Sequence, residues 1–250
     1  MNKEVNRKIA LVTGGSGGIG TEVCKQLAEK NYKVILTGKD QNKVNAVCHF
    51  LNKNNLDIIP FKLDVTSEEN VKNIYNFIME NFGRLDVLVN NAAVYFDNRV
   101  NGIYPKFFDL DSETLRKTME VNFYGAFCLS HKFIPIMQSN NYGRIVNVSS
   151  GMARFEDLDI RGPFYRMSKV ALNALTCILA DVCKGLDICI NSVCPGWVQS
   201  KMGGSKAVKS PYEGAMGIVL AATLPEGGPS GKFFRDGEAL DWCLKLGDPY

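Results

Sequence analysis

The stretch Ile9–Gly20, IALVTGGSGGIG, decides the fold. Its first five residues form an apolar run typical of a short buried β-strand, and its glycine cluster leads into Thr21–Lys30, where apolar residues return at helical spacing. Glycine permits a tight turn and a close approach of the backbone to a ligand, and the free N–H groups at the start of the next helix attract an anion. A strand, a glycine turn and a helix in this order predict a site for the pyrophosphate of a dinucleotide.

The rest of the chain repeats this alternation of strand and helix. Further strands are expected at Lys33–Thr37, Asp57–Leu63, Leu85–Asn90, Arg144–Ser149 and Asp187–Cys194, and helices at Asp40–Asn54, Thr66–Asn81, Asp111–Gln138 and Tyr165–Lys184. Thr66, with Glu69 three residues on, is the expected cap of its helix. Short, continuous apolar runs are typical of strands that are buried on both faces in a parallel sheet. We therefore predict a single Rossmann-type, doubly wound α/β domain over residues 1–250, with a parallel β-sheet flanked by helices and a substrate-side flap around residues 205–229.

Composition and charge exclude several classes of protein. Hydrophobic residues make up 46% of the 250 residues and charged residues 22%, which excludes a disordered or fibrous chain. The net charge is +3 and the basic residues are scattered, so neither nucleic acid nor an anionic membrane is an expected partner. Eight dispersed cysteines and two histidines predict buried, reduced thiols and no metal site. The short polar start at Met1–Lys8 and the lack of an apolar stretch of ~18 residues predict a cytoplasmic protein without a signal peptide or a membrane span.

The glycines of the first turn are spaced as Thr13-Gly14-xxx-Gly18-Ile19-Gly20, and in this the chain resembles the short-chain dehydrogenase/reductase family. The family's other motifs follow in order: Asp64-Val65, Asn90-Asn91-Ala92-Ala93, Asn122, Ser150, Tyr165 and Lys169 as YxxxK, Pro195-Gly196 and Ser200. The resemblance covers nearly the whole chain and implies an oxidoreductase whose catalytic residues are Asn122, Ser150, Tyr165 and Lys169. It also implies cofactor contacts from Thr13, Gly14, Ser16, Gly18, Ile19, Gly20, Lys39, Asp64, Val65, Asn90, Ala92, Tyr165, Lys169, Pro195, Gly196, Val198 and Ser200.

The chemistry of the last motifs also follows from the residues themselves. Tyr165 and Lys169 are four apart on an expected helix and share a face, so an ammonium there should lower the pKa of the phenol from about 10 toward the working pH. Ser150 ends a strand, where its hydroxyl can donate a hydrogen bond to a substrate oxygen that gains negative charge. Ser149 is the alternative, and the family pattern favours Ser150. The resemblance implies that Asn122 holds a water that links Lys169 to solvent.

The choice of cofactor depends on the residues after the second strand, Thr37-Gly38-Lys39-Asp40. A carboxylate at this place binds a ribose 2′-hydroxyl, and a basic group binds a 2′-phosphate. No acid occupies position 37 or 38, and Lys39 matches the place where NADP-dependent family members carry a basic residue. We therefore expect NADP(H), with NAD(H) as the alternative if Lys39 is only a solvated loop lysine.

Within the family, Cys194–Met202, Lys209–Pro211 and Gly231–Trp242 resemble the carbonyl reductase subgroup, which includes menthone-type reductases. The monomeric members of that subgroup carry a long insertion between the catalytic serine and tyrosine, whereas Ser150 and Tyr165 are separated by a short segment here. Without this insertion to cover them, two long helices carry more apolar positions than one stripe facing the core needs, which predicts an exposed apolar surface. The alternative is a single wide stripe that faces the core. These apolar positions are Phe123, Phe127, Phe133, Leu172, Leu175 and Leu179. We therefore expect a homodimer or homotetramer.

The expected function is transfer of hydride from NADPH to the carbonyl of a bulky, largely apolar ketone, aldehyde or quinone, with Tyr165 as proton donor. The substrate's bulk and apolarity follow from side chains that should line its pocket: Tyr95, Phe96, Phe155, Trp197 and Met202. Two alternatives remain at this point. One is an NAD-dependent alcohol dehydrogenase that works oxidatively, and the other is a dinucleotide-binding scaffold without turnover.

Overall fold

The computed structural model describes residues 7–98, 100 and 102–240, and these are built on one eight-stranded sheet of order β3-β2-β1-β4-β5-β6-β7-β8. The strands are β1 (Ile9–Val12), β2 (Lys33–Gly38), β3 (Ile58–Lys62), β4 (Val87–Asn90), β5 (Gly143–Val148), β6 (Ile188–Cys194), β7 (Phe233–Arg235) and β8 (Glu238–Leu240). The first seven strands are parallel, and β8 is antiparallel to β7. The expected α/β class with a parallel sheet is confirmed.

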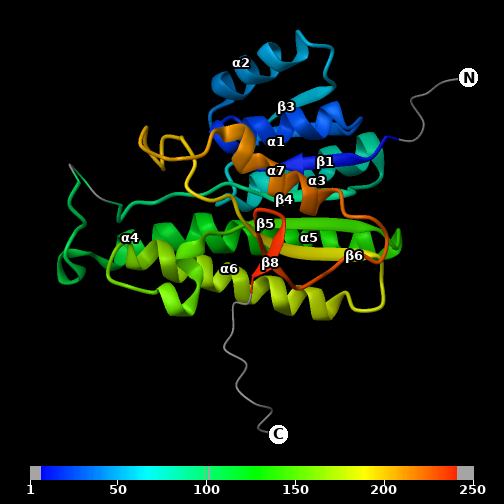
Figure 1. Cartoon of the computed structure of the whole chain (residues 1–250). Coiled ribbons are helices and arrows are strands. Elements are labelled where there is room, and N and C mark those ends of the chain that lie inside the picture. Colours follow the sequence, from blue (N-terminus) through cyan, green and yellow to red (C-terminus); the bar gives the residue numbers. More distant parts are fainter. Residues whose placement is uncertain (1–6, 99, 101, 241–250) are drawn as a thin grey trace, which may run out of the picture.

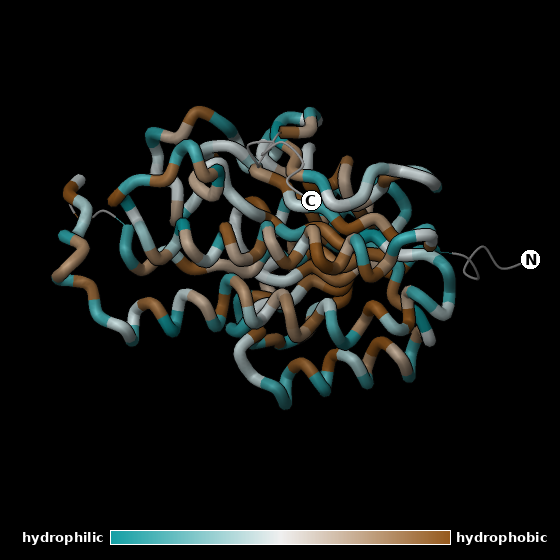
Figure 2. Tube along the Cα trace, turned by 90° about the horizontal axis from the view of Figure 1, so that it is seen from below, coloured by the Kyte–Doolittle hydropathy of each residue, from teal (hydrophilic) through white to brown (hydrophobic). Residues whose placement is uncertain are grey.

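Helices cover both faces of this sheet (Figure 1). One layer contains α1 (Gly18–Glu29), α2 (Gln41–Asn52) and α7 (Pro211–Ala222), and the other contains α3 (Glu68–Phe82), α4 (Ser112–Met119), α5 (Gly125–Ser139) and α6 (Pro163–Val182). Two apolar clusters, one on each face, join the helices to the strands. Figure 2 shows the apolar residues gathered along the central strands. Among the helices of the described residues, none has the length and apolar character that a bilayer crossing requires.

The strand order reverses between β1 and β4, and this reversal positions the site. The helices after β1 and β4 lie on opposite faces, so a crevice opens at the carboxyl ends of these two strands. Val12 pairs with Val89, and Asn90 pairs with Asn147, which brings the ends of β1, β4 and β5 to the same edge. The glycine turn after β1 therefore lies beside the segments that follow β4 and β5.

Several local expectations were wrong in detail. The cap of α3 is Ser67, whose hydroxyl accepts from the Asn70 N–H, while Thr66 instead donates to Asp64. The helix expected at Asp111–Gln138 is divided by a π-helical turn, which separates α4 from α5. The strands β7 and β8 were not expected, because three-residue strands carry too little periodicity to be recognised.

The expected flap around residues 205–229 is wrong for its helical part. Helix α7 packs into the core with α1, and its Ala215, Ile218 and Val219 are buried against the sheet. Small residues allow this close packing, whereas the proline and glycine content had suggested a helix plus loop outside the regular alternation. Trp242, part of the expected subgroup pattern, lies outside the described residues.

The expectation of buried thiols holds only in part. The buried cysteines are Cys24, Cys48, Cys183, Cys189 and Cys194. Cys177 is exposed, since its place on α6 faces outward, and Cys128 is half-buried. Cys243 lies outside the described residues.

Candidate active site

The residues expected to be catalytic meet at the carboxyl edge of the sheet. Tyr165 and Lys169 lie one turn apart on α6, Ser150 is the second residue after β5, and Asn122 lies in the π-helical turn before α5. The hydroxyls of Tyr165 and Ser150 are hydrogen-bonded to each other. The side chains of Tyr165, Lys169 and Asn122 are all buried.

Burial controls the proton affinities of Tyr165 and Lys169. Desolvation raises the pKa of Tyr165 above its ordinary value, although the hydrogen bond from Ser150 lowers it in part. Burial lowers the pKa of Lys169 from 10.5 to about 7, and its Nζ donates to the Val148 carbonyl at 2.8 Å. Nζ lies 5.7 Å from the centre of the Tyr165 ring. The expected lowering of the tyrosine pKa by an ammonium is therefore wrong for this structure, because burial raises this pKa by more than the hydrogen bond from Ser150 lowers it.

Asn122 connects the end of β4 to helix α6. Its Oδ1 accepts from the Val94 N–H at 2.8 Å, and its Nδ2 donates to the Val94 carbonyl at 2.9 Å and to Ser168 Oγ at 3.0 Å. Both amide hydrogens are therefore engaged by the protein. Any water that links Asn122 to Lys169 would therefore have to bind to an oxygen of Asn122.

The two serines after β5 have different surroundings. Ser149 is 2% exposed, and its hydroxyl is buried without a partner in the described part of the chain. Ser150 is half-buried, and its Oγ accepts from the Met152 N–H at 3.2 Å and contacts the Tyr165 hydroxyl. Adjacent residues in extended backbone point to opposite sides, and here the second serine faces the site.

The glycine turn is shaped to approach a ligand closely. Gly14 has a φ of +62°, which favours glycine, and a Cβ there would lie 3.0 Å from the Cα of Ala92. At Gly20 a Cβ would clash with the Gly14 carbonyl and the Asn91 amide. Gly17 caps α1 without any side-chain hydrogen bond, so the first N–H groups of the helix point into the crevice. This cradle of backbone donors fits a pyrophosphate.

Asn91 was not expected among the site residues, yet it fixes this turn. Its Nδ2 donates to the carbonyls of Thr13 and Gly14 at 2.8 and 3.1 Å. In return, Thr13 Oγ1 accepts from the N–H groups of Asn91 and Ala92 at 3.0 and 2.9 Å. Thr13 therefore supports the site by joining two loops. The pair of asparagines was the signal in the sequence, but only one of the two was assigned to the cofactor.

Asn90, the one that was assigned, points its side chain away from the crevice. Its Nδ2 donates to Asn147 at 2.8 Å and to Ser130 at 3.3 Å, and Asn147 donates in turn to Thr176 at 2.8 Å. Thr176 continues this buried polar chain to Ser192 on β6. The Oδ1 of Asn90 is buried and has no hydrogen-bond partner in the described part of the chain.

The residues expected near the adenosine lie where β2 and β3 end. Lys39 is exposed, and a Cβ on Gly38 would lie 2.8 Å from Ser16 Oγ, so these loops are in contact. Asp40 caps α2 by accepting from the Lys43 N–H at 3.1 Å. Partial burial raises the pKa of Asp64, but hydrogen bonds from Thr66 and the charge of Lys39 outweigh this and lower it.

The segment after β6 closes the other side of the cradle. Gly196 has a φ of +81°, and Val198 forms a bridge with Lys209. A Cβ on Gly18 would lie 3.5 Å from the Cβ of Ser200. The residues expected here are therefore brought to the start of α1, and Val65 also packs nearby, against Gly125 at the start of α5.

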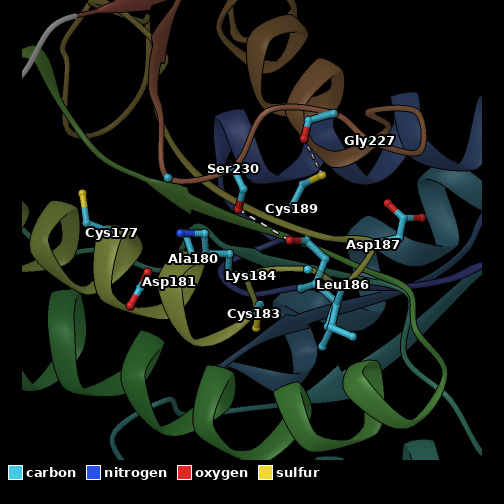
Figure 3. Close-up of a pocket in the computed structure, with 14 residues that line it drawn as sticks. Cys177, Ala180, Asp181, Cys183, Lys184, Leu186, Asp187, Cys189, Gly227 and Ser230 are labelled. Atoms are coloured by element: carbon cyan, nitrogen blue, oxygen red, sulfur yellow. Dashed lines mark hydrogen bonds between the residues drawn. The ribbon is translucent and has the colours of Figure 1, made fainter.

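A separate depression of about 420 Å³ lies at the opposite edge of the sheet (Figure 3). The end of α6, the start of β6 and residues 227–231 surround it, with Cys177, Cys183 and Cys189 in its wall. No group of three His, Cys, Asp or Glu side chains in the described residues could hold a metal ion. None of the residues that line it belongs to the glycine turn or to the Tyr165 cluster, so this depression is not the site.

Comparison with known proteins agrees with the geometry. Residues 8–210 match the family model described as short chain dehydrogenase. The chain belongs to the short-chain dehydrogenase family. This membership agrees with the resemblance seen in the sequence motifs and with the strand order of the sheet.

Similar proteins include several reductases of this family. Mouse "Carbonyl reductase [NADPH] 1" is 30% identical, with 95% of this chain and 99% of that protein covered. "(+)-Neomenthol dehydrogenase" of Capsicum annuum is 30% identical, with 93% and 96% covered. The solved structure "ElxO with NADP Bound" has a TM-score of 0.83 at 26% identity and covers 92% of this chain and 97% of its own. The alignment to the mouse protein extends over 283 residues, so that relative contains segments that the 250-residue chain lacks.

The shifted pKa of Lys169 predicts a pH-dependent stability. Between a pH of about 7 and 10.5 the unfolded chain keeps a proton that the folded chain has released, so the free energy of unfolding should rise with pH across this interval. Lys169→Met should lose this rise. Urea unfolding of both proteins at several pH values measures it, with the exposed Lys201→Met as control. An equal pH dependence in wild type and Lys169→Met would contradict the prediction.

Proposed function

We propose that this protein reduces the carbonyl of a bulky, largely apolar ketone, aldehyde or quinone with NADPH, and that Tyr165 donates the proton. The observation that carries the proposal is the hydrogen-bonded pair of Tyr165 and Ser150 hydroxyls beside the glycine cradle. When bound, the nicotinamide supplies a hydride to the carbonyl carbon. The phenol of Tyr165 is protonated at neutral pH, so it has a proton to give to the carbonyl oxygen, although burial raises its pKa.

Ser150 and Lys169 support the proton donor in different ways. Ser150 is placed to donate a hydrogen bond to the carbonyl oxygen, where negative charge grows during reduction. Lys169 has a pKa of about 7, so it exchanges a proton readily at neutral pH and can restore the one that Tyr165 gives up. The connection from Asn122 through Ser168 to α6 keeps this helix against the end of β4.

Apolar and aromatic side chains around the crevice suit an apolar substrate. Tyr95 stacks on Tyr165, with ring centres 4.3 Å apart. Phe96, Phe155 and Trp197 are exposed although they are large and apolar, which leaves them free to meet a ligand. The aromatic side chains favour a bulky carbonyl compound over a small polar one.

The residues at the end of β2 favour NADPH over NADH. Oδ1 of Asp40 accepts the cap hydrogen bond of α2, and neither Thr37 nor Gly38 offers a carboxylate to a ribose 2′-hydroxyl. Lys39 beside it is exposed and cationic, as a 2′-phosphate requires. The named NADPH dependence of the mouse relative supports the same choice.

Two exposed helices are the basis for proposing a homodimer, or a dimer of dimers. Phe133, Leu172 and Leu175 are buried in the core, so the expectation that these three side chains belong to an exposed apolar surface was wrong. Other apolar residues on α5, α6 and the turn before α5 are exposed: Tyr124, Phe127, Met167, Ile178 and Val182. An apolar face of this kind favours an isologous contact with a second copy. The cytoplasmic location expected from the sequence stays a prediction.

The proton-donor role predicts the effect of three substitutions. Tyr165→Phe keeps the packing of the ring but removes the proton, so turnover should fall by ~10²–10⁴-fold while NADPH binding persists. Ser150→Ala should also be severe, and Ser149→Ala is the matched control with a mild effect. Initial rates over a panel of ketones, aldehydes and quinones, with NADPH and NADH side by side, measure this. Near wild-type turnover in Tyr165→Phe would refute the role, and a larger loss in Ser149→Ala would reverse the choice of serine.

The role of Lys39 predicts a change in cofactor preference. A charge-assisted contact to a phosphate is worth about 1.5–3 kcal/mol, so Lys39→Ala should weaken NADPH binding by about 10- to 100-fold and leave NADH almost unchanged. Titration of both cofactors by fluorescence measures the two affinities. Lys53→Ala removes the same charge at the far end of α2 and serves as control. Equal losses for the two cofactors, or a wild-type preference for NADH, would contradict the assignment.

The proposed assembly predicts a mass of at least twice 27.7 kDa in light scattering at micromolar concentration. Ile178→Glu places a charge on the exposed face of α6 and should shift the protein toward the monomer. Phe50→Glu introduces the same charge at an exposed apolar residue of α2 and should leave the mass unchanged. A wild-type mass near 27.7 kDa would overturn the proposal.

A further inference from the structure

Asp97 lies at the start of the helix that carries Tyr165. Helix α6 follows Gly162, which has a φ of +66° and no side chain to cap the helix. The Asp97 carboxylate takes this place from another part of the chain: Oδ2 accepts from the Phe164 N–H at 2.6 Å, and both oxygens lie 3.3 Å from the Tyr165 nitrogen. The first N–H groups of a helix have no partner within the helix, so the carboxylate satisfies donors that α6 cannot satisfy itself.

The burial of Asp97 makes this contact unusual. The residue is 0% exposed, and a buried carboxylate is costly unless hydrogen bonds and favourable charges compensate for its lost hydration. The backbone N–H groups of Phe164 and Tyr165, at the positive end of the helix dipole, provide both. A neutral or exposed capping residue would stabilise the helix at less cost, so helix stability alone is a weak reason for this arrangement.

The segment that contains Asp97 also holds the ring of Tyr165. Tyr95, two residues earlier, stacks on that ring at 4.3 Å with an angle of 23° between the planes. A Cβ on Gly162 would clash with the ring and hydroxyl of Tyr95, so glycine at the helix start is what allows the stack. The loop after β4 therefore contacts Tyr165 at two points: Asp97 accepts from its backbone N–H, and Tyr95 stacks on its ring.

We propose that Asp97 is a positioning residue for the reaction, which fixes the first turn of α6 so that the Tyr165 hydroxyl stays on Ser150 and aimed at the substrate oxygen. The inference rests on the proposed reductase function. Asp97 touches neither Ser150 nor the crevice in any hydrogen bond described above, and acts through the backbone of Tyr165.

The charge of Asp97 also acts on Tyr165, because it raises the pKa of the phenol. Burial is the largest cause of the raised pKa of Tyr165, the hydrogen bond from Ser150 opposes it, and electrostatic interactions with Cys194 and Asp97 add to it. The other ionisable groups that face the Tyr165 ring are Tyr95, stacked on it, and Lys169, 5.7 Å away. Neutralising Asp97 therefore lowers the pKa of Tyr165 and makes the tyrosinate easier to form.

Two substitutions separate position from charge. Asp97→Ala removes both, and because a misplacement of ~1 Å costs about 10²-fold, kcat should fall by about this factor while KM for NADPH stays within about twofold. Asp97→Asn keeps one acceptor oxygen for Phe164 N–H, so its loss in kcat should be smaller. In the oxidation of the product alcohol, where Tyr165 must be deprotonated, the acid limb of the pH profile should move to lower pH in Asp97→Asn. Asp109→Asn makes the same change at an exposed site in the following loop and serves as control.

A readout that needs no turnover completes the test. Amide hydrogen exchange at Phe164 and Tyr165, followed by NMR, should be faster in Asp97→Ala than in wild type and in Asp109→Asn. If wild type reduces no carbonyl with either cofactor, the proposed function fails, while unchanged exchange at these two amides would overturn the role of Asp97 separately. Wild-type kcat and pH profile in both Asp97 variants would also overturn it. So would a loss of kcat that is matched by an equal loss of NADPH affinity and melting temperature, since that result indicates a general defect in folding.

Discussion

The hydrogen bonds between Thr13 and Asn91 are the constraint on which the site depends. They join the ends of β1 and β4, the two strands between which the strand order reverses, and they hold the glycine turn against the segment after β4. Once that turn is fixed, the N-terminus of α1 points into the crevice, and the loop from Ala92 to Asp97 runs across it toward α6. The glycine cradle and Tyr165 therefore share one support: a change at the Thr13–Asn91 contact affects both, whereas a change at Asp97 affects only α6.

Burial explains the chemistry of the site better than proximity of charges. Tyr165, Lys169 and Asp97 all lie out of contact with bulk water, where an isolated charge is penalised. The consequence is a protonated phenol beside an amine whose pKa is about 7, rather than a tyrosinate beside an ammonium. The charge of Asp97 is compensated by backbone N–H groups at the positive end of the α6 helix dipole. A site that holds its proton on the phenol is suited to reduction.

Much of the fold could be predicted from the sequence because its signals are local. Six strands are largely apolar runs, such as Ile9–Val12, and each is separated from the next by a helical pattern. The failures occur where the local signal is ambiguous. Thr66 and Ser67 are adjacent hydroxyl residues, and only the backbone conformation decides which of them caps α3. Helix α7 is rich in glycine and alanine, so nothing in its periodicity reveals that one side of it packs on the sheet beside α1.

The residues of the candidate site also divide into those with a local signal in the sequence and those without one. Tyr165 and Lys169 could be found because one helical turn places them on one face, and Ser150 because of its place at the end of a strand. Asn91 and Asp97 could not, since their partners lie 78 and 68 residues away in the sequence. Asn90 and Asn91 even look interchangeable, and they differ only because adjacent residues at a strand end point to opposite sides, one into the buried polar chain and the other into the turn. Residues that carry out a reaction can often be read from local spacing, but the residues that hold them in place act across the fold, so they can be identified only when the fold is known.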